Sequence, residues 1–270
     1  VSNCTKLLGV KKMIYKTIRM VIFVAIICSA CSTAPKLHEY QGGTHLVLHI
    51  EKTDNKKIDD DNQITISQIL GKRLHDYGIK KFLIDLDNNH QIILKLPQSV
   101  KCDERLTNLI TQPSKLEFKI VEDDYELDSE KTDNLPSNLE IIHSVENRYR
   151  KKKMYVVQKK SLLHGNHIKD AKVILNQFNQ PIVTIDFNEN GTKIFEKITA
   201  ENIGNKLAII LDGKIYSAPI IHEKIPGGKT IISGAYSPDW AKNLAISLRN
   251  GFYPSKVTVF EKGVISQDER

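Results

Sequence analysis

The sequence predicts an α+β fold built as two linked modules, and three observations lead to this prediction. Short runs of alternating apolar and polar residues, typical of half-buried strands, lie between segments whose apolar residues recur every three or four positions, typical of helices. The chain has 270 residues, enough for two domains of modest size. Residues 123–139 are acidic, poor in apolar side chains and contain Pro136, so they are expected to link the two modules.

Residues 44–122 are predicted to form a base module with the order βαββαβ of a ferredoxin-like unit. Acidic residues introduce its first helix, and Gly78 is a natural stop for that helix. Two alternating runs around Asn88-Asn89 are typical of a tight hairpin, and Pro113 prevents the second helix from continuing. The expected elements are strand 44–50, a helix that follows Asp59–Asp61 and has apolar positions from Ile66 to Tyr77, strands 81–86 and 90–96, helix 103–111 and closing strand 116–120.

Residues 140–262 are predicted to form a second, head-like module, followed by a tail at 263–270. The Asp212-Gly213 pair between two apolar runs is among the strongest hairpin signals in a sequence. Ser237 can cap the last helix, and Pro238 fits its first turn. The expected elements are strands 153–158, 171–176 and 182–187, helix 191–202, strands 207–211, 214–217 and 230–233, helix 238–250 and strand 255–260.

Residues 1–30 are predicted to be an export signal. Basic residues precede the short apolar run Met20–Cys28, and small residues follow it. Met13 is a candidate start, because the segment from there has ordinary signal-peptide proportions. An uncleaved membrane anchor is disfavoured, since the run is shorter than the roughly 20 apolar residues that span a bilayer.

The end of this signal indicates lipidation. The sequence Cys28-Ser29-Ala30-Cys31 resembles a bacterial lipobox, so Cys31 is expected to be acylated and to become the mature N-terminus. Residues 31–43 are then a tether between the lipid and the first module. An ordinary secretory signal cleaved near Ala30 or Ala34 is the alternative.

The formal net charge of +7 suggests nucleic acid as a partner, but the distribution of the charges argues against it. Cleavage before Cys31 removes five basic residues and leaves 34 of the 39 Lys and Arg residues against 32 Asp and Glu, a net charge of about +2. The basic cluster Arg148–Lys153 is then better explained as a solvated linker than as a phosphate-binding track. No nucleic acid is expected as a partner.

No motif indicates catalysis, a metal or a cofactor, so the sequence predicts a non-enzymatic protein. Residues 227–230 end like a phosphate-binding P-loop, but Glu223 stands where that motif requires glycine, and a turn that enters a strand is expected instead. The pairs His164/His167 and His45/His49 lack a third ligand at a fixed spacing. Only Cys102 would remain after processing and lipidation, which excludes a disulfide framework. An enzyme whose carboxylates meet only in the fold stays open as a minor hypothesis.

The glycines and prolines of the chain follow an order and spacing known from one family. The matching segments are Gly42-Gly43-Thr44-His45, Leu116-Glu117-Phe118, Gly165, Asn202-Ile203-Gly204, Leu211-Asp212-Gly213, Ser217-Ala218-Pro219, Gly227-Gly228, Ile232-Ser233-Gly234 and Leu248-Arg249-Asn250-Gly251 ahead of Pro254. This pattern resembles the large periplasmic domain of SecD, an accessory subunit of the bacterial Sec translocon. Because each position is a turn constraint, the resemblance indicates the fold first and the function second.

The resemblance implies a base-and-head domain that holds emerging unfolded polypeptide. In the family, one transmembrane helix precedes this domain and five follow it. Here a lipid on Cys31 is expected to replace the first helix, and the sequence to Arg270 carries no helical bundle, so proton-driven action is not expected.

The leading hypothesis is a non-catalytic protein of the bacterial cell envelope that faces the periplasm and is held to the membrane by its N-terminal lipid. Its expected partners are unfolded exported polypeptides and the Sec translocon. A repurposed envelope lipoprotein with a structural or adaptor role is the alternative. The sequence does not indicate the binding surface, and the inner and outer membranes both stay open.

Overall fold

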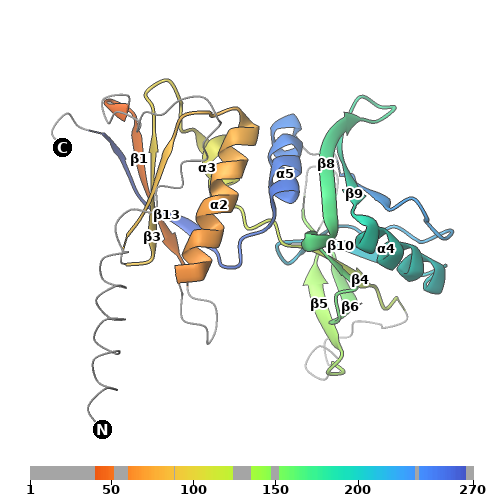
Figure 1. Ribbon diagram of the computed structural model, residues 1–270. Coiled ribbons are helices and arrows are strands. Elements are labelled where there is room, and N and C mark those ends of the chain that lie inside the picture. The colour runs from red at the N-terminus through yellow and green to blue at the C-terminus, as the bar shows by residue number, and fades with distance from the viewer. Residues whose placement is uncertain are drawn as a thin grey trace, which may run out of the picture.

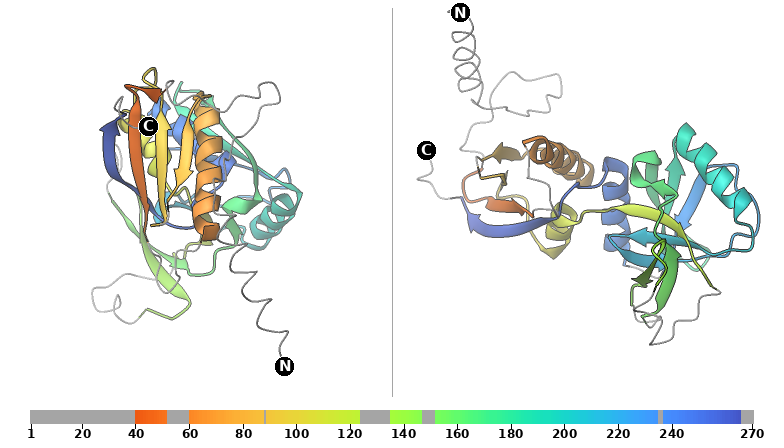
Figure 2. Two further views of the ribbon diagram at one scale, coloured as in Figure 1. Left: turned by 60° about the vertical axis from the view of Figure 1, so that its left-hand side comes forward. Right: turned by 90° about the horizontal axis from the view of Figure 1, so that it is seen from below.

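The computed structural model describes residues 40–51, 60–87, 89–123, 135–146, 152–234 and 237–265. These residues form two bodies, here named the base and the head, with helix α5 (Pro238–Asn250) between them (Figures 1 and 2). The predicted signal, Cys31, most of the tether and most of the linker lie outside the described residues.

The base consists of a four-stranded antiparallel sheet in the order β13-β1-β3-β2, with helices α2 and α3 packed against one face. The bounds are β1 Thr44–Ile50, α2 Asp60–Tyr77, β2 Leu83–Leu86, β3 Gln91–Leu96, α3 Glu104–Thr111 and β13 Val257–Val264. Alternate residues of β1 and β3, from Leu46 to Ile50 and from Ile92 to Leu96, are fully buried against both helices. This alternation fixes which face of the sheet carries the core.

The ferredoxin-like arrangement is present, but its fourth strand is not the one that the sequence suggests. Strand β4 (Leu116–Ile120) forms where expected, yet it pairs with a strand of the head, and the C-terminal β13 lies beside β1 in the base. Phe118 of β4 packs edge-on against Phe187 and Phe195, and this aromatic cluster holds the strand in the head. Both strands carry a similar alternating pattern, so the local sequence does not decide between them.

The head contains two sheets and a separate hairpin. The sheet orders are β11-β10-β4-β7 and β12-β9-β8, and β5 pairs with β6. The bounds are β5 Leu139–His143, β6 Met154–Gln158, β7 Leu163–His164, β8 Ile168–Leu175, β9 Pro181–Phe187, α4 Glu189–Glu201, β10 Leu207–Leu211, β11 Lys214–Ser217 and β12 Lys229–Ile232. Strand β10 is buried on both faces, since Ile209 belongs to the main head core and Ile210 to a smaller cluster with the β5–β6 hairpin.

Most predicted elements of the second half are confirmed to within a few residues. Asp212 and Gly213 form the hairpin turn with positive φ angles of 50° and 75°. Glycine adopts such an angle without strain, which suits Gly213 to the second position. The side chain of Ser237 accepts a hydrogen bond of 3.1 Å from the N–H of Trp240 and so caps α5. Residues 226–227 form the expected turn before β12. Strand β5 was not predicted, because its apolar residues begin at the end of the acidic stretch.

Candidate functional site

Helix α5 joins the head to the base and is buried on both sides. Its residues Ala241, Leu244, Ala245 and Leu248 belong to the head core. On the opposite face, Ile246 belongs to the base core, and Asn243 and Ser247 are buried beside it. The Nδ2 atom of Asn243 donates to the main-chain carbonyl of Arg105 in α3 at 2.8 Å. The head side of α5 is therefore apolar, whereas its base side is mixed.

Arg73 of α2 binds both chain segments that connect the base to the head. Its guanidinium donates to the carbonyls of Gln112 at 2.5 Å and Pro113 at 3.3 Å on the segment leading to β4, and to the carbonyl of Gly251 at 2.9 Å after α5. A further bond reaches the carbonyl of Leu109, and the group lies 4.1 Å above the ring of Tyr253. Burial lowers the pKa of Arg73 from its usual range. The buried guanidinium of Arg73 therefore holds the two connecting segments next to each other.

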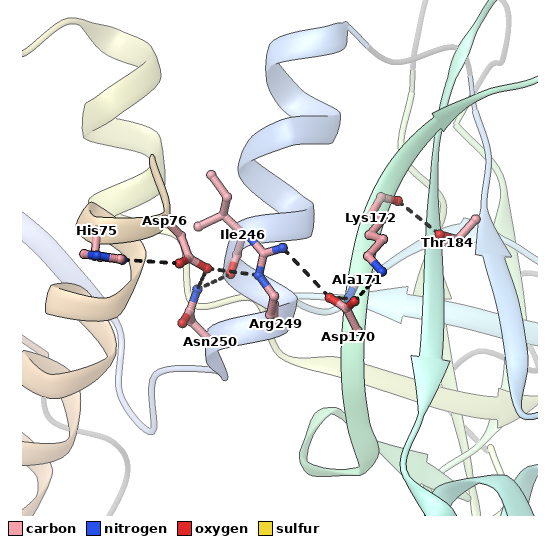
Figure 3. Close-up of polar contacts among 9 residues, drawn as sticks. All are labelled: His75, Asp76, Asp170, Ala171, Lys172, Thr184, Ile246, Arg249 and Asn250. Atoms are coloured by element: carbon pink, nitrogen blue, oxygen red, sulfur yellow. Dashed lines mark hydrogen bonds and ion pairs between the residues drawn. The ribbon is translucent and has the colours of Figure 1, made fainter. Parts of the chain in front are cut away.

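A chain of ion pairs also links α2, α5 and β8. Figure 3 shows Arg249 of α5 between Asp76 of α2 and Asp170 of β8. The Nε atom of Arg249 lies 2.9 Å from Asp76, and its Nη1 atom lies 3.9 Å from Asp170. Asp76 also accepts a hydrogen bond from Asn250 at 2.9 Å, and Asp170 pairs with Lys172 at 2.8 Å.

These contacts determine the protonation of the two carboxylates. Burial alone would raise the pKa of Asp76, but the hydrogen bond from Asn250 and the charge of Arg249 together hold this pKa below its usual range. The hydrogen bond from Lys172 is the main cause that lowers the pKa of Asp170. Both groups are therefore charged at neutral pH, and Arg249 holds the two bodies together electrostatically.

A groove of about 960 Å³ lies between α3, the first turns of α5 and strand β13. Its α3 wall includes Glu104 and Asn108, and its α5 wall includes Trp240. Arg105 of α3 contacts Asp239 of α5 at 2.6 Å and donates to the hydroxyl of Tyr77 at 2.7 Å. Another wall is formed by Val257, Thr258 and Val259 of β13 and by Lys256, the residue before this strand.

Two further titratable groups lie at or beside this groove, Asp212 in its lining and Tyr216 against Trp240. Asp212 lines it and accepts a hydrogen bond from the N–H of Lys115 at 2.8 Å; burial raises the pKa of Asp212. The ring of Tyr216 stacks on that of Trp240 with centroids 5.2 Å apart, and burial raises the pKa of Tyr216 to about 12. Within the described part of the chain, no three His, Cys, Asp or Glu side chains lie close enough to hold a metal ion. The groove therefore offers a binding surface with mixed polar and apolar walls.

The hairpin of β8 and β9 carries a second exposed surface, here named the finger and comprising residues 173–182. No charged residue occurs from Val173 to Ile185, in a chain that is 26 % charged. Leu175 is 60 % exposed and Phe178 is 71 % exposed, and Val173 and Ile174 are exposed beside them. Strand β12 pairs only with residues 183–186 of β9, so the finger extends beyond the three-stranded part of the sheet (Figure 1).

The turn of the finger is well ordered by its own hydrogen bonds. The side-chain oxygen of Asn176 accepts from the N–H groups of Phe178 and Gln180, both at 2.9 Å. The N–H of Asn179 donates to the carbonyl of Asn176, and Asn179 has a positive φ of 58°. The exposed ring of Phe178 is therefore presented on a fixed turn.

The structure brings together few of the residues that the sequence singled out. Cys31 lies outside the described residues, so its lipidation stays a prediction. Cys102 is buried and carries no disulfide. Arg73 was not recognised as a site residue, although an arginine seven positions after Ile66 falls on the apolar face of α2 and could have signalled a buried role. The groove could not be predicted, because its α3 wall lies more than 100 residues before its α5 and β13 walls in the sequence.

Related sequences cover most of the chain. Residues 140–254 match the family model described as SecDF, P1 head subdomain. The protein translocase subunit SecD of Acidaminococcus fermentans is 32 % identical over 255 residues, which are 94 % of this chain and 52 % of the relative. SecD of Magnetococcus marinus is 33 % identical over 218 residues, 80 % of this chain and 41 % of the relative. The chain spans about half the length, or less, of these relatives.

Two solved structures share the fold. The structure described as SecDF in a super-membrane-facing form aligns with a TM-score of 0.65 at 28 % identity, over 83 % of this chain and 30 % of the solved chain. The structure described as a membrane component SecDF that enhances protein export aligns with a TM-score of 0.64 at 28 % identity, over 82 % of this chain and 100 % of the solved chain. No helix among the described residues is long and apolar enough to cross a bilayer.

Proposed function

The chain is homologous to SecD over its base and its head, which confirms the resemblance seen in the sequence, and we propose that it assists protein export by holding segments of unfolded polypeptide. The homologues are named as protein translocase subunits, and one solved relative is described as enhancing protein export. The proposed activity is binding, without catalysis or a cofactor. Its proposed partners are exported polypeptides and the Sec translocon.

The finger is the observation that carries this proposal. Contiguous exposed apolar side chains mark interaction sites in soluble domains. An unfolded polypeptide exposes apolar side chains of its own, and the absence of charge from Val173 to Ile185 means that no ion has to be desolvated when the two meet. Burying a side chain such as Leu175 or Phe178 contributes about 1.5–3 kcal/mol. Such a surface would hold a polypeptide reversibly.

Binding to a permanently unfolded protein tests the proposal. Fluorescently labelled, reduced and carboxymethylated α-lactalbumin is titrated with the purified protein, and fluorescence anisotropy gives the Kd. The double variant Leu175→Asp/Phe178→Asp is expected to bind at least about tenfold more weakly, because each tenfold corresponds to 1.4 kcal/mol. Met154→Asp is the matched control, since Met154 is half exposed on β6, outside the finger.

The outcomes of this titration are distinct. Equal affinity of the finger variant and the wild type would refute the finger as the binding surface. Binding of the wild type to vesicles of phosphatidylglycerol and phosphatidylethanolamine, without binding to the unfolded protein, would indicate a lipid surface instead. Normal export with an altered envelope in a deletion strain would favour the structural or adaptor role over export.

The proposal includes a membrane anchor at Cys31. Small residues and a cysteine after the apolar run support lipidation there, and a lipid would keep the base close to a membrane. Cells grown with labelled palmitate are expected to label the wild type and not the Cys31→Ser variant. Incorporation of label into Cys31→Ser would contradict the assignment. Fractionation of inner and outer membranes then tests contact with the translocon, which requires the inner membrane.

A further inference from the structure

Strand β13 forms an edge of the base sheet and has a free side. It pairs with β1, and no other described strand pairs with it. The N–H of Glu51 donates to the carbonyl of Lys256 at 2.8 Å, so Glu51 and Lys256 are a hydrogen-bonded pair of the ladder. Hydrogen-bonded pairs alternate with non-hydrogen-bonded ones, so His49 and Thr258 are the next hydrogen-bonded pair. By the alternation of an antiparallel ladder, the main-chain groups of Val257 and Val259 point away from β1. Neither residue has a main-chain partner on that side within the described part of the chain.

The second half of the same edge is protected. The pairing with β1 shifts between Val47 and Leu48, so Phe260 is an extra residue that bulges out of the ladder. Beyond the bulge, the Nζ atom of Lys262 donates to the carbonyl of Cys102 at 2.7 Å. Bulges and lysines are common devices that prevent unwanted pairing at sheet edges. The open part of the edge is therefore the short stretch that ends at Val259.

This open stretch faces the groove. Lys256, Val257, Thr258 and Val259 all line it, opposite α3 and α5. A neighbouring strand would lie about 4.8 Å from β13 and rise about 3.3 Å per residue. A groove of about 960 Å³ has room for a few extended residues there. The free edge is thus recessed between two helices, where an added strand would also meet side chains.

We propose that a segment of the held polypeptide binds in this groove as an added strand on β13. The inference rests on the proposed function, because it names the second place where the unfolded chain is held. Main-chain hydrogen bonds supply affinity with little dependence on sequence, which suits a protein that must accept many different polypeptides. The main-chain donors and acceptors of Val257 and Val259, which have no partner among the described residues, favour an extended polypeptide as the occupant.

Hydrogen exchange of individual amides tests this assignment. The amides of Val257 and Val259 are followed by NMR in the protein alone and with saturating reduced, carboxymethylated α-lactalbumin. Strand addition is expected to slow the exchange of the Val259 amide at least tenfold. Binding of the probe without such protection would overturn the strand addition and leave the proposed function intact. Absence of any binding would overturn both.

Two variants make the test independent of exchange. Asn108 is exposed on α3 and lines the groove, so Asn108→Trp fills it and is expected to weaken binding of the probe about tenfold or more. Gln68→Trp, at an exposed position of α2 outside the groove, is the matched control. Val259→Pro removes the outward N–H and keeps the bonds to β1, with urea unfolding as the check of its fold. Unchanged affinity in both Asn108→Trp and folded Val259→Pro would refute the inference.

A second copy of the chain is the competing occupant. Pairing of two β13 edges would give a dimer, visible by sedimentation equilibrium, and protection of the Val259 amide that rises with protein concentration without any probe. That result would overturn the assignment to a held polypeptide. A monomer whose Val259 amide is protected only by the unfolded probe supports it.

Discussion

The two faces of α5 differ in how they hold the molecule together. Toward the head, the helix presents a continuous apolar stripe of alanines and leucines that is part of one core with both head sheets. Toward the base, a single large apolar residue of the helix, Ile246, lies among Asn243, Ser247 and Asn250, and polar contacts supply the rest. The helix is therefore a component of the head, and the base is attached to it largely by directed polar contacts, among which those of Arg73 are central.

On the base side, replacing Arg73 is expected to lower the free energy of unfolding most. Arg73→Met removes the donor to the carbonyls of Leu109, Gln112 and Gly251, whereas the carbonyl of Pro113 still accepts from the N–H of Tyr253; each unsatisfied buried group costs about 1–3 kcal/mol. We expect a loss of about 4 kcal/mol in the free energy of unfolding, measured by urea denaturation. Lys72→Met, at the exposed neighbouring position, should change it by less than about 0.5 kcal/mol. A similar small change in both variants would contradict the role given to Arg73.

Truncation on the head side tests the apolar stripe. Leu244 is fully buried in the head core, and Leu244→Ala is expected to lower the free energy of unfolding by about 3 kcal/mol, through lost burial and the cavity left behind. Lys193→Ala, at an exposed position of α4 in the head, is the control and should be nearly neutral. A loss below about 1 kcal/mol for Leu244→Ala would show that the head core does not depend on α5.

Local signals in the sequence predicted the elements well and their partners poorly. Ser237 and the Asp212-Gly213 turn act within a few residues, so their capping and turn chemistry could be recognised from the sequence alone. The pairing of β4 depends on the contacts of Phe118 with Phe187 and Phe195, which lie about 70 residues or more later in the sequence. The residues next to Phe118 therefore do not indicate this pairing. The family resemblance identified the domain but not its surfaces.

The candidate surfaces were hidden from the sequence for the same physical reason. The groove exists because α3, α5 and the last strand converge, and the free edge of β13 exists because that strand ends the base sheet. The finger is a partial exception, since the charge-free run from Val173 to Ile185 is visible in the sequence. Its exposure is not, because an apolar run is equally compatible with a buried strand.

A smaller effect is expected from Asn243 on the base side. Asn243→Ala removes the hydrogen bond from its Nδ2 atom to the carbonyl of Arg105, worth about 1 kcal/mol in the free energy of unfolding. The side chain is buried, so the loss should be accompanied by faster amide exchange in α3, where the carbonyl partner lies. A loss as large as that of Leu244→Ala would erase the difference between the two faces of α5.

Removing the ion pairs of Arg249 should lower the free energy of unfolding least. Among these variants, this is the loss that should depend on pH. The pKa values of Asp76 and Asp170 are lowered in the folded protein, so their contribution is fully present above the unfolded value of about 3.9 and is lost as the pH falls through the folded pKa values. Arg249 is more than one third exposed, so solvent screening limits the expected loss for Arg249→Ala to about 0.5 kcal/mol at pH 7. The difference from the wild type in urea denaturation should shrink as the pH falls below about 4. A difference that stays constant over this range would mean that Arg249 acts through packing of its stem, because packing does not titrate with the carboxylates.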